Sequence, residues 1–270
     1  MKKSAKILLT LLCIVFVCVF GVSAYKVYET VFAPGGYYQS NQNAKEVQQA
    51  YTKPAASTKP AATPSGAVQA IVGEQIVLDP EVSPIEVDFE ALKQRNPDIV
   101  AWLYCPNTVI NYPITQTDDN MYYLHKDIDN NYSSYGTLFV ECLNQKGFKD
   151  KNNIIYGHHM NDGKMFAKLV DYVYQSYYDE HPVMYLNTPD MNYRIELFSG
   201  YVTPMESETY LLSFLSEAEN QEWLDSCISQ SRFQSNVDVK TSDRILTLST
   251  CTYDYDDARF VVQGKMVPIH

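Results

Sequence analysis

The stretch R-I-L-T-L-S-T-C-T-Y-D-Y-D-D-A-R-F-V-V-Q-G-K, residues 244–265, decides how the rest of the chain is interpreted. Residues 245–250 are rich in β-forming side chains and residues 258–262 form a second apolar run, so two strands joined by an acidic turn are predicted. Cys251 ends the first strand and Arg259 lies on the second. Because side chains alternate along a strand, Cys251 shares a face with Ser249, and cross-strand pairing brings a cation within reach of the thiol.

A second strand-like run, N-N-I-I-Y-G-H at residues 152–158, ends in a histidine that follows a glycine. A cysteine without partners is more often a buried packing residue than a nucleophile. A strand-end cysteine with a strand-end histidine and a strand-borne arginine is different, because it supplies a nucleophile, an acid/base and a fixed donor for an oxyanion. The three residue types together indicate acyl transfer through a thiol.

These motifs resemble those of the sortase family. T-L-S-T-C at 247–251, with an arginine eight residues later and Y-G-H at 156–158 far upstream, is similar to the class B branch in particular. The similarity runs from about residue 88 to residue 265 and includes N-Y-P-I at 111–114 and G-T-L-F at 136–139. The resemblance implies a mainly β fold with inserted helices: a closed sortase-type β-barrel, an N-terminal helix, and an added helix before the last two strands.

The resemblance also implies the chemistry of a cysteine transpeptidase, without a cofactor. Such an enzyme cleaves a C-terminal sorting signal in exported proteins through a thioester. It passes the acyl group to an amine of a peptidoglycan precursor, which anchors the protein to the Gram-positive cell wall. Two alternatives keep the same three residues: a class B-like pilin polymerase, and a thiol peptidase that only hydrolyses. A non-enzymatic surface module is a third reading.

By this resemblance His158, Cys251 and Arg259 are the expected catalytic residues. His158 is preferred to His159 because adjacent residues on a strand face opposite ways, and because the family's histidine directly follows the glycine. Arg244 is excluded, since it lies seven residues before Cys251, about 23 Å away at about 3.3 Å per residue. Ser249, Thr250, Tyr210 and Leu211 match the family's substrate groove and are expected to shape it. His125, His181 and His270 have no supporting context and are expected to be surface or packing residues.

The charge of the chain limits its partners. Lys and Arg number 21 against 32 Asp and Glu, a net charge of −11. Nucleic-acid binding is therefore excluded, because phosphate contacts need a basic face. The aspartates at 118, 119, 127 and 129 match no EF-hand spacing, and no metal is expected. Asp254, Asp256 and Asp257 beside the cysteine form either a solvated turn or a cluster that attracts a cationic acceptor.

The N-terminus predicts export. Residues 7–24 are almost wholly apolar and, at about 1.5 Å per residue, span about 27 Å of a hydrocarbon core about 30 Å thick. Lysines ahead of this segment place the N-terminus in the cytoplasm, so residues 1–30 are expected to be a cytoplasmic tip with a single-pass anchor, or a cleaved signal peptide. Residues 31–83, polar and then Ala/Thr/Pro-rich, are expected to be an extended tether, and residues 84–270 an extracellular catalytic domain.

The remaining elements follow from local patterns. Helices are predicted over 88–96, over 162–178, and after a capping box at 216–219. Besides 152–158 and the final pair, strands are predicted at 99–105, 109–114, 137–140 and 193–202. Of the cysteines outside the apolar segment, Cys105, Cys142, Cys227 and Cys251, none is expected to form a disulfide, because the domain is large enough without one and a nucleophile must stay free. Cys227 is expected to lie in the core.

Overall fold

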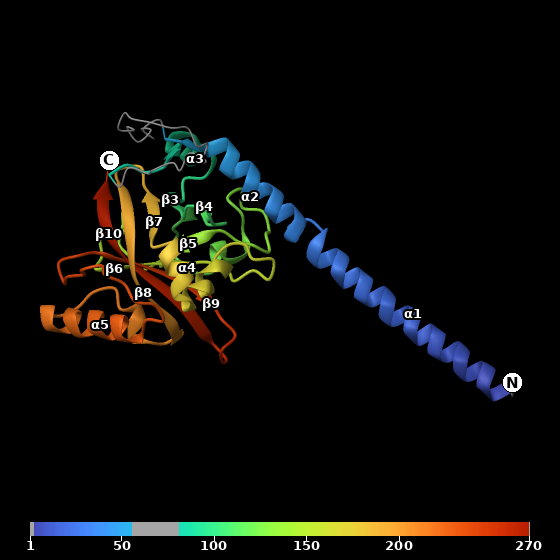
Figure 1. Ribbon diagram of the computed structural model, residues 1–270. Coiled ribbons are helices and arrows are strands. Elements are labelled where there is room, and N and C mark those ends of the chain that lie inside the picture. Colours follow the sequence, from blue (N-terminus) through green and yellow to red (C-terminus); the bar gives the residue numbers. More distant parts are fainter. Residues whose placement is uncertain (1–2, 56–80, 270) are drawn as a thin grey trace, which may run out of the picture.

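The computed structural model of the chain describes residues 3–55 and 81–269. Eight strands close into a barrel in the order β10-β8-β7-β3-β4-β5-β6-β9 (Figure 1). The strands are β3 (Ile99–Tyr104), β4 (Asn111–Thr115), β5 (Leu138–Val140), β6 (Asn152–Tyr156), β7 (Val183–Asn187), β8 (Asn192–Pro204), β9 (Ile245–Cys251) and β10 (Ala258–Ile269). Most neighbours are antiparallel, but β4 with β5 and β6 with β9 are parallel. The prediction of a mainly β, closed barrel is confirmed.

Every second side chain along the strands points into the barrel, and these side chains fill its interior. Inward residues such as Leu103, Ile155, Leu248 and Val262 are fully or almost fully buried in one apolar core. The strand β7 was missed by the sequence analysis, which placed 162–178 in one helix and left the following residues unassigned. Its five residues are too short a run to stand out from their surroundings.

Helix α5 (Glu217–Gln230) covers the outer face of β8 and β10 and begins where the capping box predicted. Ser216 Oγ accepts a hydrogen bond from the Glu219 amide at 3.1 Å. Trp223 and Cys227 of this helix pack against Tyr201 and Val261 in a second cluster, which confirms Cys227 as a core residue. All six cysteines are unpaired, as expected for the four outside the apolar segment.

The helix predicted over 162–178 is replaced by shorter pieces. A 3-10 segment, η2 (Ala167–Val173), is followed by α4 (Gln175–Glu180). Gly163 and Met165 have positive φ angles of 79° and 53°, and residues in this left-handed region cannot continue a right-handed helix. Two more 3-10 turns, η1 (Tyr122–His125) and η3 (Glu208–Tyr210), lie near the ends of strands. Helix α3 (Phe89–Arg95) begins after Asp88, whose carboxylate caps it as predicted.

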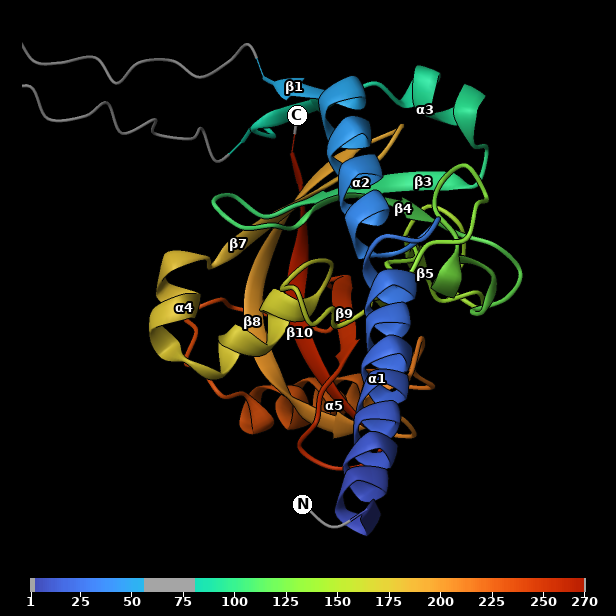
Figure 2. The same cartoon turned by 90° about the vertical axis from the view of Figure 1, so that its right-hand side faces the viewer.

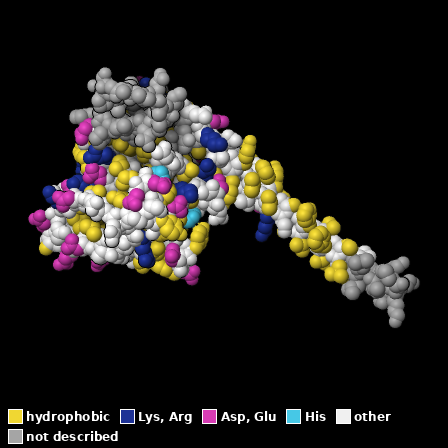
Figure 3. All heavy atoms as spheres, viewed as in Figure 1, with side chains coloured by type: hydrophobic (Ala, Val, Ile, Leu, Met, Phe, Trp, Pro, Cys, Tyr) yellow, Lys and Arg dark blue, Asp and Glu magenta, His cyan; other side chains and the backbone are white. Residues whose placement is uncertain are grey.

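The N-terminal part of the structure is one long apolar helix followed by a second helix docked on the barrel. Helix α1 (Lys3–Val31) projects away from the barrel, and its residues Thr10–Val31 are long and apolar enough to cross a membrane (Figures 1 and 2). Hydrophobic side chains cover α1 along the face seen in Figure 3. Composition and length alone also fit a signal sequence.

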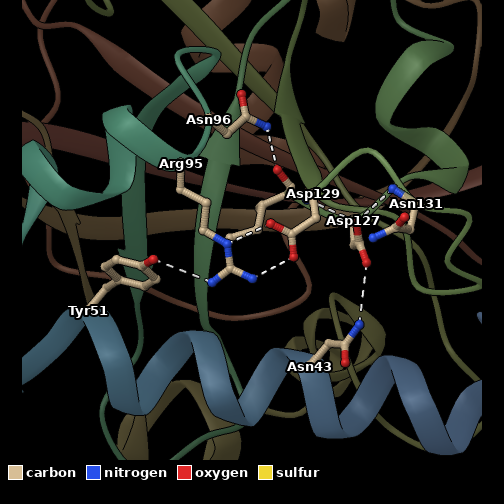
Figure 4. Close-up of polar contacts among 8 residues, drawn as sticks. Asn43, Tyr51, Arg95, Asn96, Asp127, Asp129 and Asn131 are labelled. Atoms are coloured by element: carbon tan, nitrogen blue, oxygen red, sulfur yellow. Dashed lines mark hydrogen bonds and ion pairs between the residues drawn. The ribbon is translucent and has the colours of Figure 1, made fainter.

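Helix α2 (Tyr37–Tyr51) differs from the extended tether predicted over 31–83. Its residues are mostly good helix formers, and Ser40 and Val47 are buried against the rest of the fold. Polar contacts tie α2 and α3 to the loop after η1 (Figure 4): Asn43 donates to Asp127, and the Arg95 guanidinium binds both Asp129 and the Tyr51 hydroxyl. Short strands β1 (Thr52–Pro54) and β2 (Ile85–Val87) then pair. Most of the Ala/Thr/Pro-rich segment, residues 56–80, lies outside the described residues.

Candidate active site

Two parallel strands bring the cysteine and the histidine to the same edge of the barrel. In β6 and β9, Tyr156 is in register with Ser249, and Gly157 N donates to Ser249 O at 3.1 Å. The ladder ends at this pair, and His158 and Cys251 each follow it by two residues. Thr250 Oγ1 donates to Gly157 O at 2.8 Å and holds the two strand ends together. Cys251 ends β9 and shares a face with Ser249, whereas His158 lies two residues beyond the end of β6.

Arg259 reaches that face from the other neighbour of β9. It is the antiparallel partner of Cys251 in the β9–β10 ladder, and directly opposed residues point to one side. Its guanidinium is fixed by two contacts, from Nη1 to Ala258 O at 3.1 Å and from Nη2 to Met205 Sδ at 3.2 Å. Within the described part of the chain it makes no ion pair with Asp256 or Asp257, so its charge is available to the face that holds Cys251.

The imidazole of His158 is half-buried and held from two directions. Its Nε2 donates to the Leu124 carbonyl at 2.7 Å, and its ring stacks on that of His125 with centroids 5.4 Å apart. Burial lowers the pKa of His158 below its ordinary value; the Leu124 carbonyl opposes this, and the neighbouring His125 adds to it. The Nε2 bond leaves Nδ1 as the nitrogen free to exchange a proton.

Gly157 is required by packing rather than by its backbone angle. A Cβ at this position would lie 2.4 Å from Leu138 Cδ2 and 2.7 Å from Phe166 Cδ2. The glycine therefore lets the strand end pass close to the core before the chain turns outward at His158.

His159 contacts the backbone of the same strand end. Its Nδ1 donates to the backbone carbonyl of Cys251 at 2.9 Å, and its ring lies against Tyr253, 5.4 Å between centroids. It supports the backbone that carries the thiol. The thiol of Cys251 is itself exposed.

Comparison with known proteins places this constellation in a family. The sortase domain profile matches residues 103–267. Sortase B of Listeria monocytogenes is 40% identical over 178 residues, which cover 65% of this chain and 72% of that protein. The chain belongs to the sortase family. It is a cysteine transpeptidase of the sortase B type.

Solved sortases share the barrel. A sortase B–substrate complex from Staphylococcus aureus is 34% identical, with a TM-score of 0.65 over 67% of this chain and 85% of the other. A sortase B structure in complex with triglycine gives a TM-score of 0.64 and 34% identity over 67% and 86% of the two chains.

Of the residues expected to shape the sortase groove, Ser249 and Thr250 directly precede Cys251 in β9, whereas the Leu211 carbonyl accepts from Asn152 Nδ2 at 2.9 Å at the start of β6. Tyr210 OH and Ser249 Oγ are 3.0 Å apart, and the Tyr210 ring stacks on Tyr156. Burial raises the pKa of Tyr210, while the hydrogen bond with Ser249 and the positive charge of Arg259 lower it and Cys251 raises it. Ser249 and Thr250 are buried, whereas Leu211 is 39% exposed. Leu211 is therefore accessible at the surface, and the Ser249 and Thr250 hydroxyls are hydrogen-bonded to Tyr210 and Gly157.

The acidic turn and Arg244 remain outside this arrangement. Asp254, Asp256 and Asp257 are exposed, and Asp254 accepts a hydrogen bond from Thr252 Oγ1 at 2.6 Å. Arg244 lies at the opposite end of β9, where its Nη1 donates to Phe148 O at 2.9 Å. Its exclusion on distance therefore agrees with the structure.

Sequence reasoning missed the surroundings of His158. His125 is exposed, as predicted, yet it stacks on His158 from a loop 33 residues earlier. Leu124 and Met205, which hold the imidazole and the guanidinium, were also not anticipated. No local pattern marks these residues, because their contacts depend on how η1 and the end of β8 meet the site.

Proposed function

We propose that this sortase cleaves an extended sorting-signal peptide at Cys251 and transfers the new acyl group to an amine. The Sγ thiolate attacks the scissile carbonyl carbon, and the carbonyl oxygen gains negative charge that the Arg259 guanidinium stabilises. The C–N bond then breaks, the leaving nitrogen takes a proton from His158, and a thioester remains on Cys251. An incoming amine attacks the thioester and gives its proton to His158, and the thiolate leaves as the new amide forms.

One observation supports this proposal: Arg259 is the direct ladder partner of Cys251, and the parallel β6–β9 ladder ends at Tyr156 and Ser249, two residues before His158 and Cys251. In the proposed arrangement the acid/base and the oxyanion donor approach the nucleophile from its two neighbouring strands. The known relatives support the two substrates, since solved sortase B structures carry a substrate and triglycine. We assign the same two classes here: an exported protein bearing a C-terminal sorting signal, and an amine of the peptidoglycan precursor.

Residues 210 and 211 supply the wall of the proposed peptide groove. Tyr210 lies between Tyr156 and Ser249, and the exposed part of Leu211 follows it along the chain. An extended peptide placed along this wall presents its scissile carbonyl at the end of β9, next to Cys251 and Arg259. Ser249 and Thr250 fix the wall and the strand end in place.

Helix α1 supports a location at the cell membrane, with residues 84–270 as the extracellular catalytic domain. Its span Thr10–Val31 has a mean hydropathy of 2.1. Lysines precede the span in the sequence, which favours a cytoplasmic N-terminus. We propose that α1 is retained as the anchor of the mature enzyme.

The test is a peptide-library assay with the full chain in detergent. The protein is incubated with a library of extended peptides and triglycine, and products are read by mass spectrometry against a Cys251→Ala blank. We expect one cleaved motif whose acyl part carries triglycine. Cleavage without ligation would identify a thiol peptidase, and products that also form in the blank would contradict the proposal.

Arg259 is expected to act through its planar fork as well as its charge. Arg259→Ala should lower kcat by about 10²- to 10³-fold, the cost of removing one oxyanion donor. Arg259→Lys should recover only part of this loss, because an ammonium cannot reproduce the fixed donor geometry. The matched control is Arg244→Lys at the other end of β9. Equal kcat values for wild type and Arg259→Ala would remove Arg259 from the mechanism.

His125 is expected to tune the pH dependence. In His125→Asn the stacked ring and its charge are lost, so the pKa of His158 should rise from its lowered value. The proposed reactive form has His158 protonated, so kcat/KM falls on the high-pH side of its profile as His158 loses its proton. In His125→Asn this fall should occur at higher pH. The pKa of His158 measured by NMR titration should rise by the same amount. His181→Asn, in a ring contact with Tyr177 away from the site, is the control. An unmoved limb would show that the stack has no influence.

A further inference from the structure

A patch of exposed large side chains surrounds the point where α1 meets the barrel. We define the aromatic patch as Phe32, Tyr38, Met121, Tyr122 and Tyr132, which are 60%, 58%, 71%, 40% and 64% exposed. Phe32 and Tyr38 are in ring contact, and Lys126 Nζ lies 5.0 Å from the Tyr122 ring centroid. Exposed apolar surface of this kind marks an interaction site when it is contiguous.

The joint between α1 and α2 makes the patch contiguous. Gly35 has a φ of 78°, and a Cβ there would lie 2.4 Å from the Tyr132 carbonyl oxygen. The Gly35 carbonyl accepts from Ser134 N at 2.9 Å, and Ser40 Oγ lies 2.9 Å from Ser133 Oγ. The end of the apolar helix is therefore seated directly on the loop that carries Tyr132.

The position of the patch relative to α1 is fixed by the docking of α2. Asn43 of α2 and Arg95 of α3 bind the loop after η1 at Asp127 and Asp129, and Arg95 also donates to the Tyr51 hydroxyl of α2 (Figure 4), so α2 is tied to the barrel. In Figures 1 and 2 the loops around η1 lie beside the α1–α2 joint. If α1 spans the bilayer to Val31, Tyr132 stands against Gly35, only four residues past that end.

We infer that the aromatic patch rests in the headgroup region of the bilayer, as a second membrane contact of the catalytic domain. Tyrosine and phenylalanine side chains with a nearby lysine suit this region, where apolar rings and polar tips are both satisfied. The rest of the domain is acidic and supplies no general electrostatic attraction to anionic lipid. The partner of the aromatic patch is therefore the lipid surface, because the patch adjoins the end of the apolar helix α1.

This contact places the active site at the membrane surface. Tyr132 is in ring contact with His125, which stacks on His158. The β9–β10 turn also points toward the side on which the free end of α1 lies (Figures 1 and 2). An amine acceptor carried on a lipid would meet the thioester without leaving the bilayer surface.

Tryptophan quenching by brominated lipid tests the inference on the full chain. Tyr132→Trp is reconstituted in phosphatidylcholine–phosphatidylglycerol vesicles with or without bromine on the acyl chains. The native Trp102 and Trp223 are buried, so the added emission reports the new site. We expect the added emission to be blue-shifted relative to that of an exposed tryptophan and to be mostly lost in brominated vesicles.

Two matched variants separate the possible outcomes. Tyr174→Trp replaces a tyrosine that is 65% exposed beside α4 and should not be quenched. Phe20→Trp, within α1, should be quenched if the anchor inserts. Quenching of Phe20→Trp without quenching of Tyr132→Trp would overturn the patch while leaving anchoring intact. If the emission of Phe20→Trp is not quenched, both the proposed anchoring by α1 and the membrane contact of the aromatic patch are contradicted. A blue shift of Tyr132→Trp that depends on protein density and not on bromine would assign the patch to a second copy of the chain and also overturn the inference.

Discussion

Cys251→Ala is expected to abolish both peptide cleavage and transfer. Cys251 is exposed at the end of β9 and is the direct ladder partner of Arg259, and in the proposed mechanism it is the nucleophile. Without a nucleophile no thioester can form, and the expected loss is on the order of 10⁴-fold or more, as for other enzymes whose nucleophile is removed. The measurement is the rate of ligated product, together with the intact mass of the protein after exposure to the peptide, which should show an acyl adduct only in wild type.

Cys142→Ala is the matched control for this loss. Cys142 is partly exposed and lies in the loop after β5, where its thiol contacts Glu141. Its replacement should leave both the acyl adduct and the ligation rate near wild type. An adduct of equal yield in Cys251→Ala would mean that another residue is the nucleophile, and the proposed mechanism would fail.

His158→Ala and His159→Ala form a pair of neighbours with opposite expected results. His158→Ala should lower kcat by about 10²- to 10⁴-fold, because it removes the group that protonates the leaving nitrogen and later accepts a proton from the amine. His159→Ala loses a hydrogen bond to the Cys251 carbonyl and a ring contact with Tyr253. The hydrogen bond contributes about 1 kcal/mol, so we expect a loss of about tenfold or less. Single-turnover acylation and deacylation rates should both fall in the first variant.

Thermal unfolding separates catalytic from structural effects in this pair. His158 is half-buried with a lowered pKa, so its protonation favours the unfolded chain, and its contribution to stability is lost as the pH falls below the ordinary histidine value. Near neutral pH this penalty is absent, and each variant loses one hydrogen bond and one ring contact, so both should unfold at similar temperatures slightly below wild type. A larger loss of kcat in His159→Ala than in His158→Ala, with both folded, would reverse the assignment.

Local patterns in the sequence predicted most of the strands, and the resemblance carried by three separated motifs supplied the closed barrel and the candidate site. Cys251 and Arg259 could be paired because one hairpin carries both, whereas the preference for His158 over His159 rested on alternation and on the family motif. The parallel pairing of β6 with β9 could not be derived in this way, because it joins segments about ninety residues apart and depends on closure of the whole barrel. The resemblance supplied that link instead.

The N-terminal helices show where local reasoning stops. Residues 37–51 are polar enough to suggest an extended tether although many of them are good helix formers, and the packing of Ser40 and Val47 on the barrel fixes them as helix α2. The stack of Tyr132, His125 and His158 is likewise invisible in the sequence, because it unites a loop, a 3-10 turn and a strand end. In both cases tertiary contacts outweigh local propensity.

The direct opposition of Cys251 and Arg259 across the β9–β10 ladder has a consequence for how relatives are found. Their spacing in the chain is set by the exposed tip of the hairpin, whereas their spacing in space is set by backbone hydrogen bonds. Insertions or deletions in the tip can therefore lengthen or shorten the interval between the two residues while the sulfur and the guanidinium keep their places. A motif search that requires a fixed number of residues between the cysteine and the arginine would miss chains in which the hairpin is intact. In engineered variants the residues of the hairpin tip can be replaced by a loop of another length.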